Sequence, residues 1–138
     1  MSRHPFILAA VLLAALLAAC AGAPRKASSS PEEAVAQRAK ERWEHLMKGR
    51  IDEALGYIAP GSRALIDRES YVAQKRNAPV MYTGVEVLEV RCEQEACTAE
   101  LKVHTQAPLP FAGMVPAWSF LRERWVRDGG TWYLVPDP

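Results

Sequence analysis

The pattern of apolar and polar positions divides the chain into a helical first half and a strand-rich second half. Across residues 31–48, apolar side chains recur at helical spacing and form one stripe that includes Trp43. Ser30 and Glu33 flank the start of this segment as a capping box, with a proline between them at the first helical position. Gly49 is expected to end the helix.

Two shorter helical segments are expected next. Residues 51–58 carry a second apolar face of helical period, which the Pro60-Gly61 pair ends. Ser62 is expected to cap a third segment, which fades before Pro79. The first half of the chain therefore predicts three helices.

The apolar period then changes from helical to alternating. The alternation predicts four strands, over residues 80–91, 97–105, 117–127 and 131–135. Residues 106–116 contain three prolines and a glycine and are expected to form an apolar loop. Asp128 and Gly129 predict a two-residue turn, which would place Trp125 opposite Trp132. Helices followed by antiparallel strands make an α+β fold.

Length and charge limit the classes of protein that fit this pattern. The chain has 138 residues and a formal net charge of +1, with 49% apolar and 24% charged residues. This length suits one domain, because two domains would each bury too small a core. The near-zero charge lacks the basic excess that non-specific nucleic-acid binding needs, so no nucleic-acid partner is expected.

Residues 1–19 have the features of a secretion signal. Arg3 supplies a basic start, and residues 6–19 form an unbroken apolar run that is too short to cross a hydrocarbon core of about 30 Å. The run ends in Leu17-Ala18-Ala19-Cys20, which resembles the lipobox of bacterial lipoproteins. This resemblance implies cleavage before Cys20 and acylation of Cys20, which anchors the protein to a membrane. The alternative is an ordinary secretory signal in which Cys20 is incidental.

The same resemblance predicts the organisation and location of the mature protein. Residues 20–30 are mostly small and polar, so they are expected to tether the lipid-bearing Cys20 to a domain over residues 31–138. Ala21 and Gly22 follow the cysteine, and the aspartate that commonly retains such proteins at the inner membrane is missing. The resemblance therefore implies the outer membrane, with the domain facing the periplasm.

Cys92 and Cys97 are expected to form a disulfide, because a pair of cysteines in an exported domain favours one. Folding the two alternating runs into a hairpin around residues 93–96 places Cys92 opposite Cys97, and directly opposed Cα atoms about 4.5 Å apart are within disulfide range. The same register pairs further apolar residues, Val90 with Ala99 and Leu88 with Leu101.

A redox pair and half of a zinc site are the alternatives to a disulfide for Cys92 and Cys97. A redox pair usually has Cys-x-x-Cys spacing beside a helix start, and the spacing here is longer. A zinc site needs four ligands, and the mature chain adds only His45 and His104.

Three segments together carry a resemblance to a known fold family. They are the first helix with Trp43, the Gly49-Arg50-Ile51-Asp52-Glu53-Ala54 and Ala59-Pro60-Gly61-Ser62-Arg63 sequences, and the closing segment 124–135. Over residues 31–136 the chain resembles NTF2-like (cystatin-like) domains. The resemblance implies a cone, in which helices pack on a strongly curved four-stranded antiparallel sheet, with a cavity at the open end. It implies no particular chemistry, because the superfamily includes enzymes, transport factors and scaffolds.

The chain contains no motif typical of serine hydrolases, zinc proteases, phosphate-binding loops or calcium loops. No catalytic residue, metal ligand or cofactor is therefore assigned. His45 and His104 are expected to be solvated, and Asp52 to stabilise a helix start through the helix dipole. The Arg122-Glu123-Arg124 run is expected on the surface, where charges of alternating sign protect a strand edge.

Most aromatic side chains are expected in the core. Tyr82 and Trp118 border the apolar segment 106–116, and with Trp43 they are the candidate contacts for a ligand or partner. The sequence favours a lipid-anchored, periplasm-facing domain that binds a small ligand or an envelope protein without catalysis. The alternatives are an assembly factor of the cell envelope and a small isomerase-like or hydrolase-like enzyme with an acid–base pair inside the cone.

Overall fold

The computed structural model describes residues 29–137, which form four helices followed by four strands. This order confirms the predicted α+β fold class. The helices are α1 (Pro31–Met47), α2 (Ile51–Leu55), α3 (Pro60–Arg63) and α4 (Arg68–Arg76), and the strands are β1 (Met81–Glu93), β2 (Ala96–Leu109), β3 (Gly113–Asp128) and β4 (Thr131–Val135).

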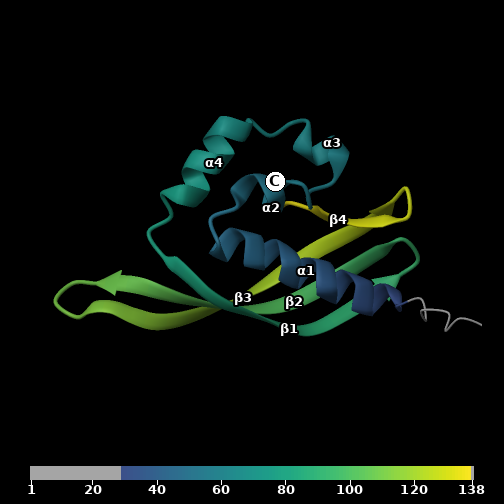
Figure 1. The fold of residues 1–138 in the computed structure, drawn as a ribbon. Coiled ribbons are helices and arrows are strands. Elements are labelled where there is room, and N and C mark those ends of the chain that lie inside the picture. Colours follow the sequence, from purple (N-terminus) through teal and green to yellow (C-terminus); the bar gives the residue numbers. More distant parts are fainter. Residues whose placement is uncertain (1–28, 138) are drawn as a thin grey trace, which may run out of the picture.

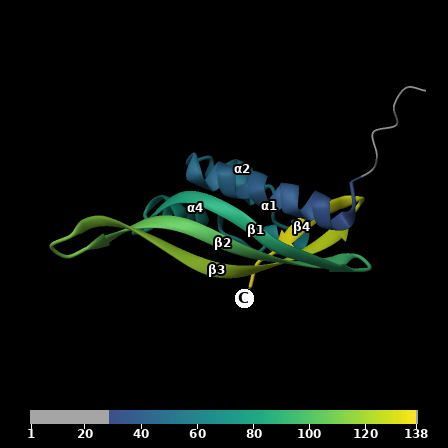
Figure 2. The ribbon, with the colours of Figure 1, turned by 90° about the horizontal axis from the view of Figure 1, so that it is seen from below.

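The four strands form one antiparallel sheet in the order β1-β2-β3-β4, so each strand pairs with its neighbour along the chain. The sheet is curved, and α1 runs along one of its faces, which we term the covered face (Figures 1 and 2). No helix among residues 29–137 packs on the opposite face, which we term the outer face. The structure therefore has the helix-on-sheet layers that the sequence predicts.

The first helix begins and ends where the sequence predicts. The Ser30 hydroxyl accepts a hydrogen bond from the Glu33 N–H (3.2 Å), and the Glu33 carboxylate accepts one from the Ser30 N–H (3.1 Å). This capping box satisfies two donors at the helix start. Gly49 directly follows the C-cap and has a φ of +70°, a left-handed conformation that favours glycine.

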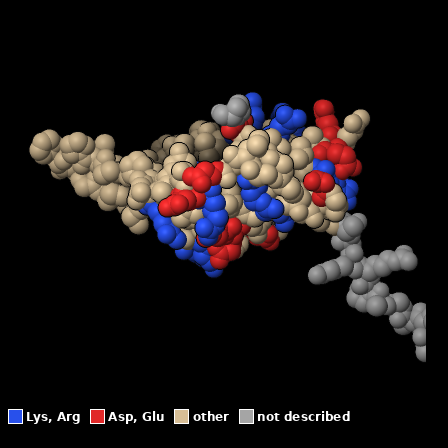
Figure 3. All heavy atoms as spheres, turned by 90° about the horizontal axis from the view of Figure 1, so that it is seen from above, with Lys and Arg blue, Asp and Glu red and all other residues tan. Residues whose placement is uncertain are grey.

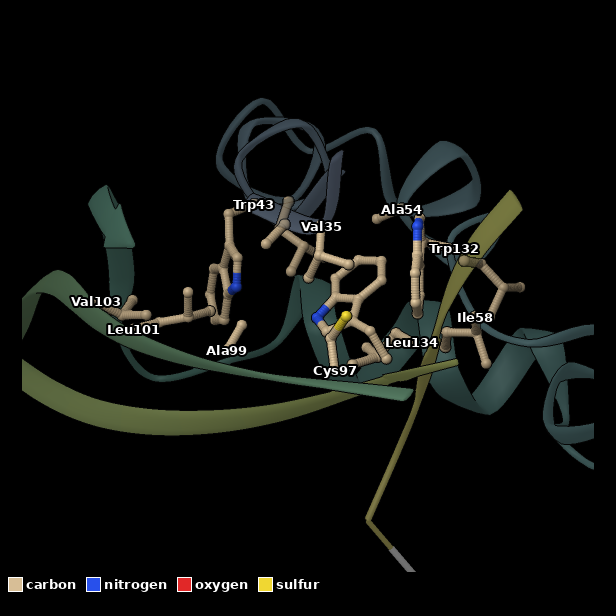
Figure 4. Close-up of a cluster of buried hydrophobic side chains, with 14 of the residues drawn as sticks. Val35, Trp43, Ala54, Ile58, Cys97, Ala99, Leu101, Val103, Trp132 and Leu134 are labelled. Carbon is tan, nitrogen blue, oxygen red and sulfur yellow. The ribbon is translucent and has the colours of Figure 1, made fainter. Parts of the chain in front are cut away.

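The core fills the space between α1, α2 and the covered face of the sheet. Figure 4 shows Trp43 of α1 pointing toward Ala99 and Leu101 of β2. All buried apolar residues of the described chain fall between Val35 and Leu134. The core of the domain is therefore complete within residues that follow the start of α1.

The turn end of the β1–β2 hairpin has the predicted register. Cys92 faces Cys97 with 4.0 Å between their Cα atoms, and their sulfur atoms form a disulfide. Val90 faces Ala99, as the alternation predicts. The two-residue turn Gln94-Glu95 closes the hairpin, because Glu93 and Ala96 still pair.

Further along this hairpin the prediction is wrong by one residue. A register shift between Val87 and Glu89 makes Val87, rather than Leu88, the partner of Leu101. The extra residue of such a bulge changes which side chains of β1 reach the covered face. Leu88 is therefore half-exposed.

Residues 106–116 do not form a loop, which corrects the prediction. β2 and β3 stay paired almost to the tip of their hairpin, with Pro110–Ala112 as the turn. Pro108 and Pro116 fit into paired strands because a proline is tolerated where its missing N–H would point away from the partner strand. The hairpin tip projects beyond the helices (Figure 1), and we term residues 107–115 the arm.

The β3–β4 hairpin turns one residue later than predicted. Gly129 and Gly130 form its two-residue turn, and both have a positive φ. Two consecutive left-handed residues suit the turn that joins tightly paired strands, and glycine adopts this conformation most readily. Trp125 consequently faces Leu134 rather than Trp132.

The helices after α1 are shorter than predicted, and the third predicted segment is divided into α3 and α4, so there are four helices rather than three. α2 ends at Leu55, and the Tyr57 carbonyl accepts a hydrogen bond from the Leu134 N–H of β4 (2.8 Å). Ser62 lies inside α3 and is not a cap. Asp67 instead caps α4 by accepting a hydrogen bond from the Ser70 N–H (3.1 Å). Within residues 29–137, no helix combines the length and apolar character that a membrane span needs.

Candidate functional site

A charged pair is buried between α1 and the covered face of the sheet. Arg42 of α1 and Glu123 of β3 are 6% and 8% exposed, and Arg42 Nη1 lies 3.0 Å from Glu123 Oε1. The indole N–H of Trp43 donates to the same oxygen (2.9 Å), and the indole N–H of Trp125 donates to Oε2 (3.2 Å). Donors from two secondary structure elements therefore hold both oxygens of the carboxylate.

The alternation of β3 explains why Glu123 lies inside. Glu123 and Trp125 are two residues apart on one strand, so both side chains point to the covered face. Glu123 faces Ala99 of β2, whose single methyl group leaves room for the longer side chain.

Burial raises the pKa of Glu123, and the Arg42 charge and the two indole hydrogen bonds act in the opposite direction. A general base must be free to reach a proton of the substrate. Because both oxygens of Glu123 already accept hydrogen bonds, this carboxylate is better suited to fastening α1 to the sheet than to acid–base catalysis.

Two buried side-chain donors have no hydrogen-bond partner within residues 29–137. They are the Arg42 Nε–H and the Tyr71 hydroxyl of α4. Lys75, one helical turn after Tyr71, has its Nζ atom 5.5 Å from the centre of the Tyr71 ring. Burial, followed by the positive charge of Arg42, lowers the pKa of Lys75. We term these three side chains the Arg42–Tyr71–Lys75 cluster, a group of donors from α1 and α4 that carries two positive charges.

A surface depression at the start of α4 includes one member of this cluster, Tyr71. It is lined by Ile66, Asp67, Ser70, Tyr71 and Gln74. Tyr71 therefore contributes both to the lining of an accessible hollow and, through its hydroxyl, to the buried donors.

The structure does not bring the three candidate aromatic residues together. Trp43 is buried, and Tyr82 packs edge-on against it with 5.2 Å between ring centres. Trp118 lies on the outer face, where it is 62% exposed and has Lys102 Nζ 5.6 Å from its ring centre. Trp43 and Tyr82 therefore belong to the interior, and Trp118 belongs to the opposite side of the sheet.

The other polar residues that the sequence singles out have ordinary structural partners. His104 lies on the outer face and contacts Glu86, and this hydrogen bond lowers the pKa of Glu86. His45 is partly buried rather than solvated, because its ring packs 5.7 Å from that of Tyr57. Asp52 lies in the first turn of α2, as expected.

The Arg122-Glu123-Arg124 run is not a protected strand edge, which corrects the prediction. Arg124 pairs with residues of both β2 and β4, so this part of β3 is interior to the sheet. Arg122 is exposed and pairs with Glu100 (3.1 Å), whereas Glu123 is buried. The two-residue spacing of Glu123 from Trp125 is the sequence signal that would have revealed the buried carboxylate.

The expected lipid site lies outside the part of the chain that the structure describes, whereas the described part can be searched for a metal site. Cys20 and the signal at residues 1–19 lie outside the described residues. Within residues 29–137, no group of three or more histidine, cysteine, aspartate or glutamate side chains is arranged to hold a metal ion.

Comparison with known proteins identifies the fold. No family model and no curated protein matches the sequence. A SEC-C motif containing protein from Rhodopseudomonas palustris has a TM-score of 0.59 at 16% identity, over 72% of this chain and 73% of that one. A putative dehydratase from the NTF2-like family of Streptomyces avermitilis has a TM-score of 0.56 at 11% identity, over 74% and 89%. An NTF2-like protein with a cystatin-like fold from Novosphingobium aromaticivorans has a TM-score of 0.53 at 13% identity, over 75% and 76%.

The fold is NTF2-like. At these identities the NTF2-like neighbours share the architecture alone, and the dehydratase description applies to the Streptomyces protein. The fold resemblance that the sequence carries over residues 31–136 is confirmed, with α1 on the covered face of an open four-stranded sheet. The function has to be inferred from the side chains that this chain places on the NTF2-like scaffold.

Proposed function

We propose that this protein is a membrane-anchored, non-catalytic binding protein of the bacterial cell envelope, whose NTF2-like domain holds a small organic anion. The Arg42–Tyr71–Lys75 cluster is the observation that supports this proposal. Buried polar groups in folded proteins almost always have a hydrogen-bond partner. A ligand with hydrogen-bond acceptors would satisfy the two buried donors of this cluster.

The chemistry of the cluster selects the class of ligand. A guanidinium N–H and an ammonium can only donate hydrogen bonds, and the Tyr71 hydroxyl can donate a third. A carboxylate accepts such bonds and balances positive charge, so charge-assisted hydrogen bonds favour it over a neutral ligand. Glu123 does not supply this acceptor: its oxygens accept from Arg42 Nη1 and two indoles, and neither oxygen lies within hydrogen-bond distance of Arg42 Nε or the Tyr71 hydroxyl.

The anchor and the compartment belong to the same proposal. The Leu17-Ala18-Ala19-Cys20 sequence followed by Ala21 supports acylation at Cys20 and an outer-membrane location facing the periplasm. The Cys92–Cys97 disulfide suits that oxidising compartment. A Cys20→Ser variant is expected to leave the membrane fraction and to lose the mass of the acyl chains. A variant that stays in the membrane fraction would contradict the anchor.

Native mass spectrometry of the protein purified gently from its own envelope tests the ligand. We expect a mass above that of the disulfide-bonded, acylated chain, and we expect the excess to disappear on unfolding. Tyr71→Phe and Lys75→Met should each lose the excess mass. Tyr57→Phe is the matched control, because the Tyr57 hydroxyl already has a partner in Glu41 (3.1 Å) and its loss should leave the ligand in place.

A clean mass for the chain, together with a Tyr71→Phe variant that is no less stable than the wild type, would contradict the anion site. The second candidate function is then an assembly factor that docks an envelope protein on the outer face. The observation that favours it is a groove on that face, lined by Leu88, Phe120 and Arg122 among others, with Phe120 exposed. Co-purification of an envelope protein that Phe120→Ser abolishes would support this second function.

A further inference from the structure

The arm is an exposed apolar projection that the proposed anion site does not use. Residues 105–121 contain no charged side chain. In Figure 3 the arm extends from the charged body of the molecule as a projection without charged atoms. Its large apolar side chains Leu109, Phe111 and Met114 are all exposed. Exposed apolar surface of this kind marks an interaction site in a folded protein.

We propose that the arm inserts into the hydrocarbon region of a lipid bilayer. Its apolar side chains occupy both faces of the hairpin: the Pro108–Met114 pair lies on one face, and Leu109 and Val115 lie on the other. A groove on a protein would cover one face of the hairpin, whereas lipid chains surround an inserted segment. The distribution of apolar residues over both faces therefore favours lipid.

The spacing of residues along the arm matches the depth of one leaflet. Five residues separate Gly113 at the tip from Trp118, which corresponds to about 17 Å at about 3.4 Å per residue. Half of a hydrocarbon core of about 30 Å is about 15 Å. Insertion to this depth would place Trp118 at the membrane interface, where tryptophan is enriched, and Lys102 beside it among the headgroups.

Two prolines reduce the number of unpaired backbone donors at the edges of the arm and its base. Each unpaired N–H group costs free energy when it leaves water. Pro108 in the arm and Pro116 at its base occupy positions whose N–H groups would point outward from the hairpin, so two outward donors are absent, and the N–H of Met114 is an outward donor that stays. The same prolines oppose the addition of a further strand, which disfavours edge-to-edge pairing with a second copy of the chain.

Phe111 has a backbone conformation that its own side chain opposes. It lies at the tip with a φ of +66°, in the left-handed region where glycine is favoured, and its side chain is fully exposed. Because the Phe111 ring is exposed, it makes no core contacts that would offset the strain of this backbone conformation. Its placement is explained if the ring gains its favourable contacts outside the chain, in lipid.

The proposal does not depend on acylation of Cys20. The arm and the start of α1 lie at opposite ends of the molecule (Figures 1 and 2), so they are separate points of contact. The test therefore uses the mature chain from residue 20 with Cys20→Ser, which carries no acyl chain and contains the whole core.

Flotation with lipid vesicles tests the insertion. We expect this chain to bind vesicles of phosphatidylethanolamine and phosphatidylglycerol and vesicles of phosphatidylcholine alone, with little effect of salt, because Lys102 and Arg122 already pair with acidic side chains. The triple change Leu109→Ser, Phe111→Ser and Met114→Ser should weaken binding by on the order of tenfold or more. The tryptophan fluorescence of a Phe111→Trp variant should be quenched by lipids brominated near the chain ends. Such quenching would show how deep the tip of the arm lies in the bilayer.

Two controls distinguish insertion of the arm from a loss of structure and from nonspecific binding to lipid. Leu65→Ser removes an exposed leucine outside the arm, and it should leave vesicle binding unchanged. Phe111→Gly should weaken binding without lowering the thermal midpoint, because glycine suits the backbone at that position. Absence of binding to both vesicle types by the Cys20→Ser chain with an unchanged arm would overturn the proposal. A dimer in solution that the triple change dissociates would also overturn it and assign the arm to a contact between copies.

Discussion

Arg42 and Glu123 are 81 residues apart in the chain and form a 3.0 Å ion pair inside the domain. The pair fastens α1 to β3, and two indole N–H groups complete its hydrogen bonds. Removing one partner of a buried ion pair is costly, because the remaining charge stays in a medium of low polarity. The pair therefore fixes the position of α1 on the sheet.

Arg42→Met is expected to lower the free energy of unfolding by about 3–5 kcal/mol, because Glu123 would stay buried without its cation. Adding Glu123→Gln should recover part of this loss, since the glutamine is neutral and its carbonyl can still accept an indole hydrogen bond. Urea unfolding of the two single variants and the double variant measures the coupling. Additive losses would show that the two side chains do not act as a pair.

The dependence of stability on pH follows from the raised pKa of Glu123. Burial makes this group bind a proton more readily in the folded chain than in the unfolded chain. Its contribution to stability is therefore fully present below the unfolded pKa and is lost as pH rises through the higher folded pKa. Wild type should lose stability relative to Glu123→Gln over that pH range. Urea unfolding at a series of pH values tests this, and parallel curves for the two proteins would refute it.

The Cys92–Cys97 disulfide is expected to contribute modestly to stability. It closes a loop of only a few residues, and the pairing of Val90 with Ala99 supports the same register. Replacing both cysteines by alanine should lower the free energy of unfolding by about 2 kcal/mol or less. A reducing agent should lower the midpoint of the wild type and leave that of the double variant unchanged. Failure of the variant to fold would contradict this expectation.

The capping box at the start of α1 can be tested with one substitution. Ser30→Ala removes the hydroxyl that accepts the Glu33 N–H and should lower the free energy of unfolding by about 1 kcal/mol. The neighbouring Ser29 is exposed and lies before the cap, so Ser29→Ala should change stability by less than about 0.5 kcal/mol. Equal effects of the two substitutions would argue against the cap.

The elements that the sequence predicts correctly are those that local chemistry specifies. Ser30, Pro31 and Glu33 define the start of α1 through contacts within one helical turn. The alternation around Cys92 and Cys97 specifies their facing positions, because the hairpin turn joins adjacent residues. These predictions need no knowledge of the rest of the chain.

The predictions that are wrong depend on the sheet as a whole. A proline-rich segment normally indicates a loop, yet Pro108 and Pro116 extend β2 and β3 because the N–H positions they lack face outward. The bulge at Leu88 lies beyond the turn residues that set the hairpin register near Cys92, and it redirects the side chains of β1. Neither feature is visible in the period of apolar residues alone.

The candidate sites divide in the same way. The sequence alone singles out Cys20 through its local motif, and it predicts the fold class through periodicity, since both are properties of neighbouring residues. Only the tertiary structure places Glu123 against Arg42, leaves the Tyr71 hydroxyl without a partner among residues 29–137 and exposes the arm. Burial and pairing between distant residues are properties of the packed sheet and helices, so a pattern along one chain cannot specify them.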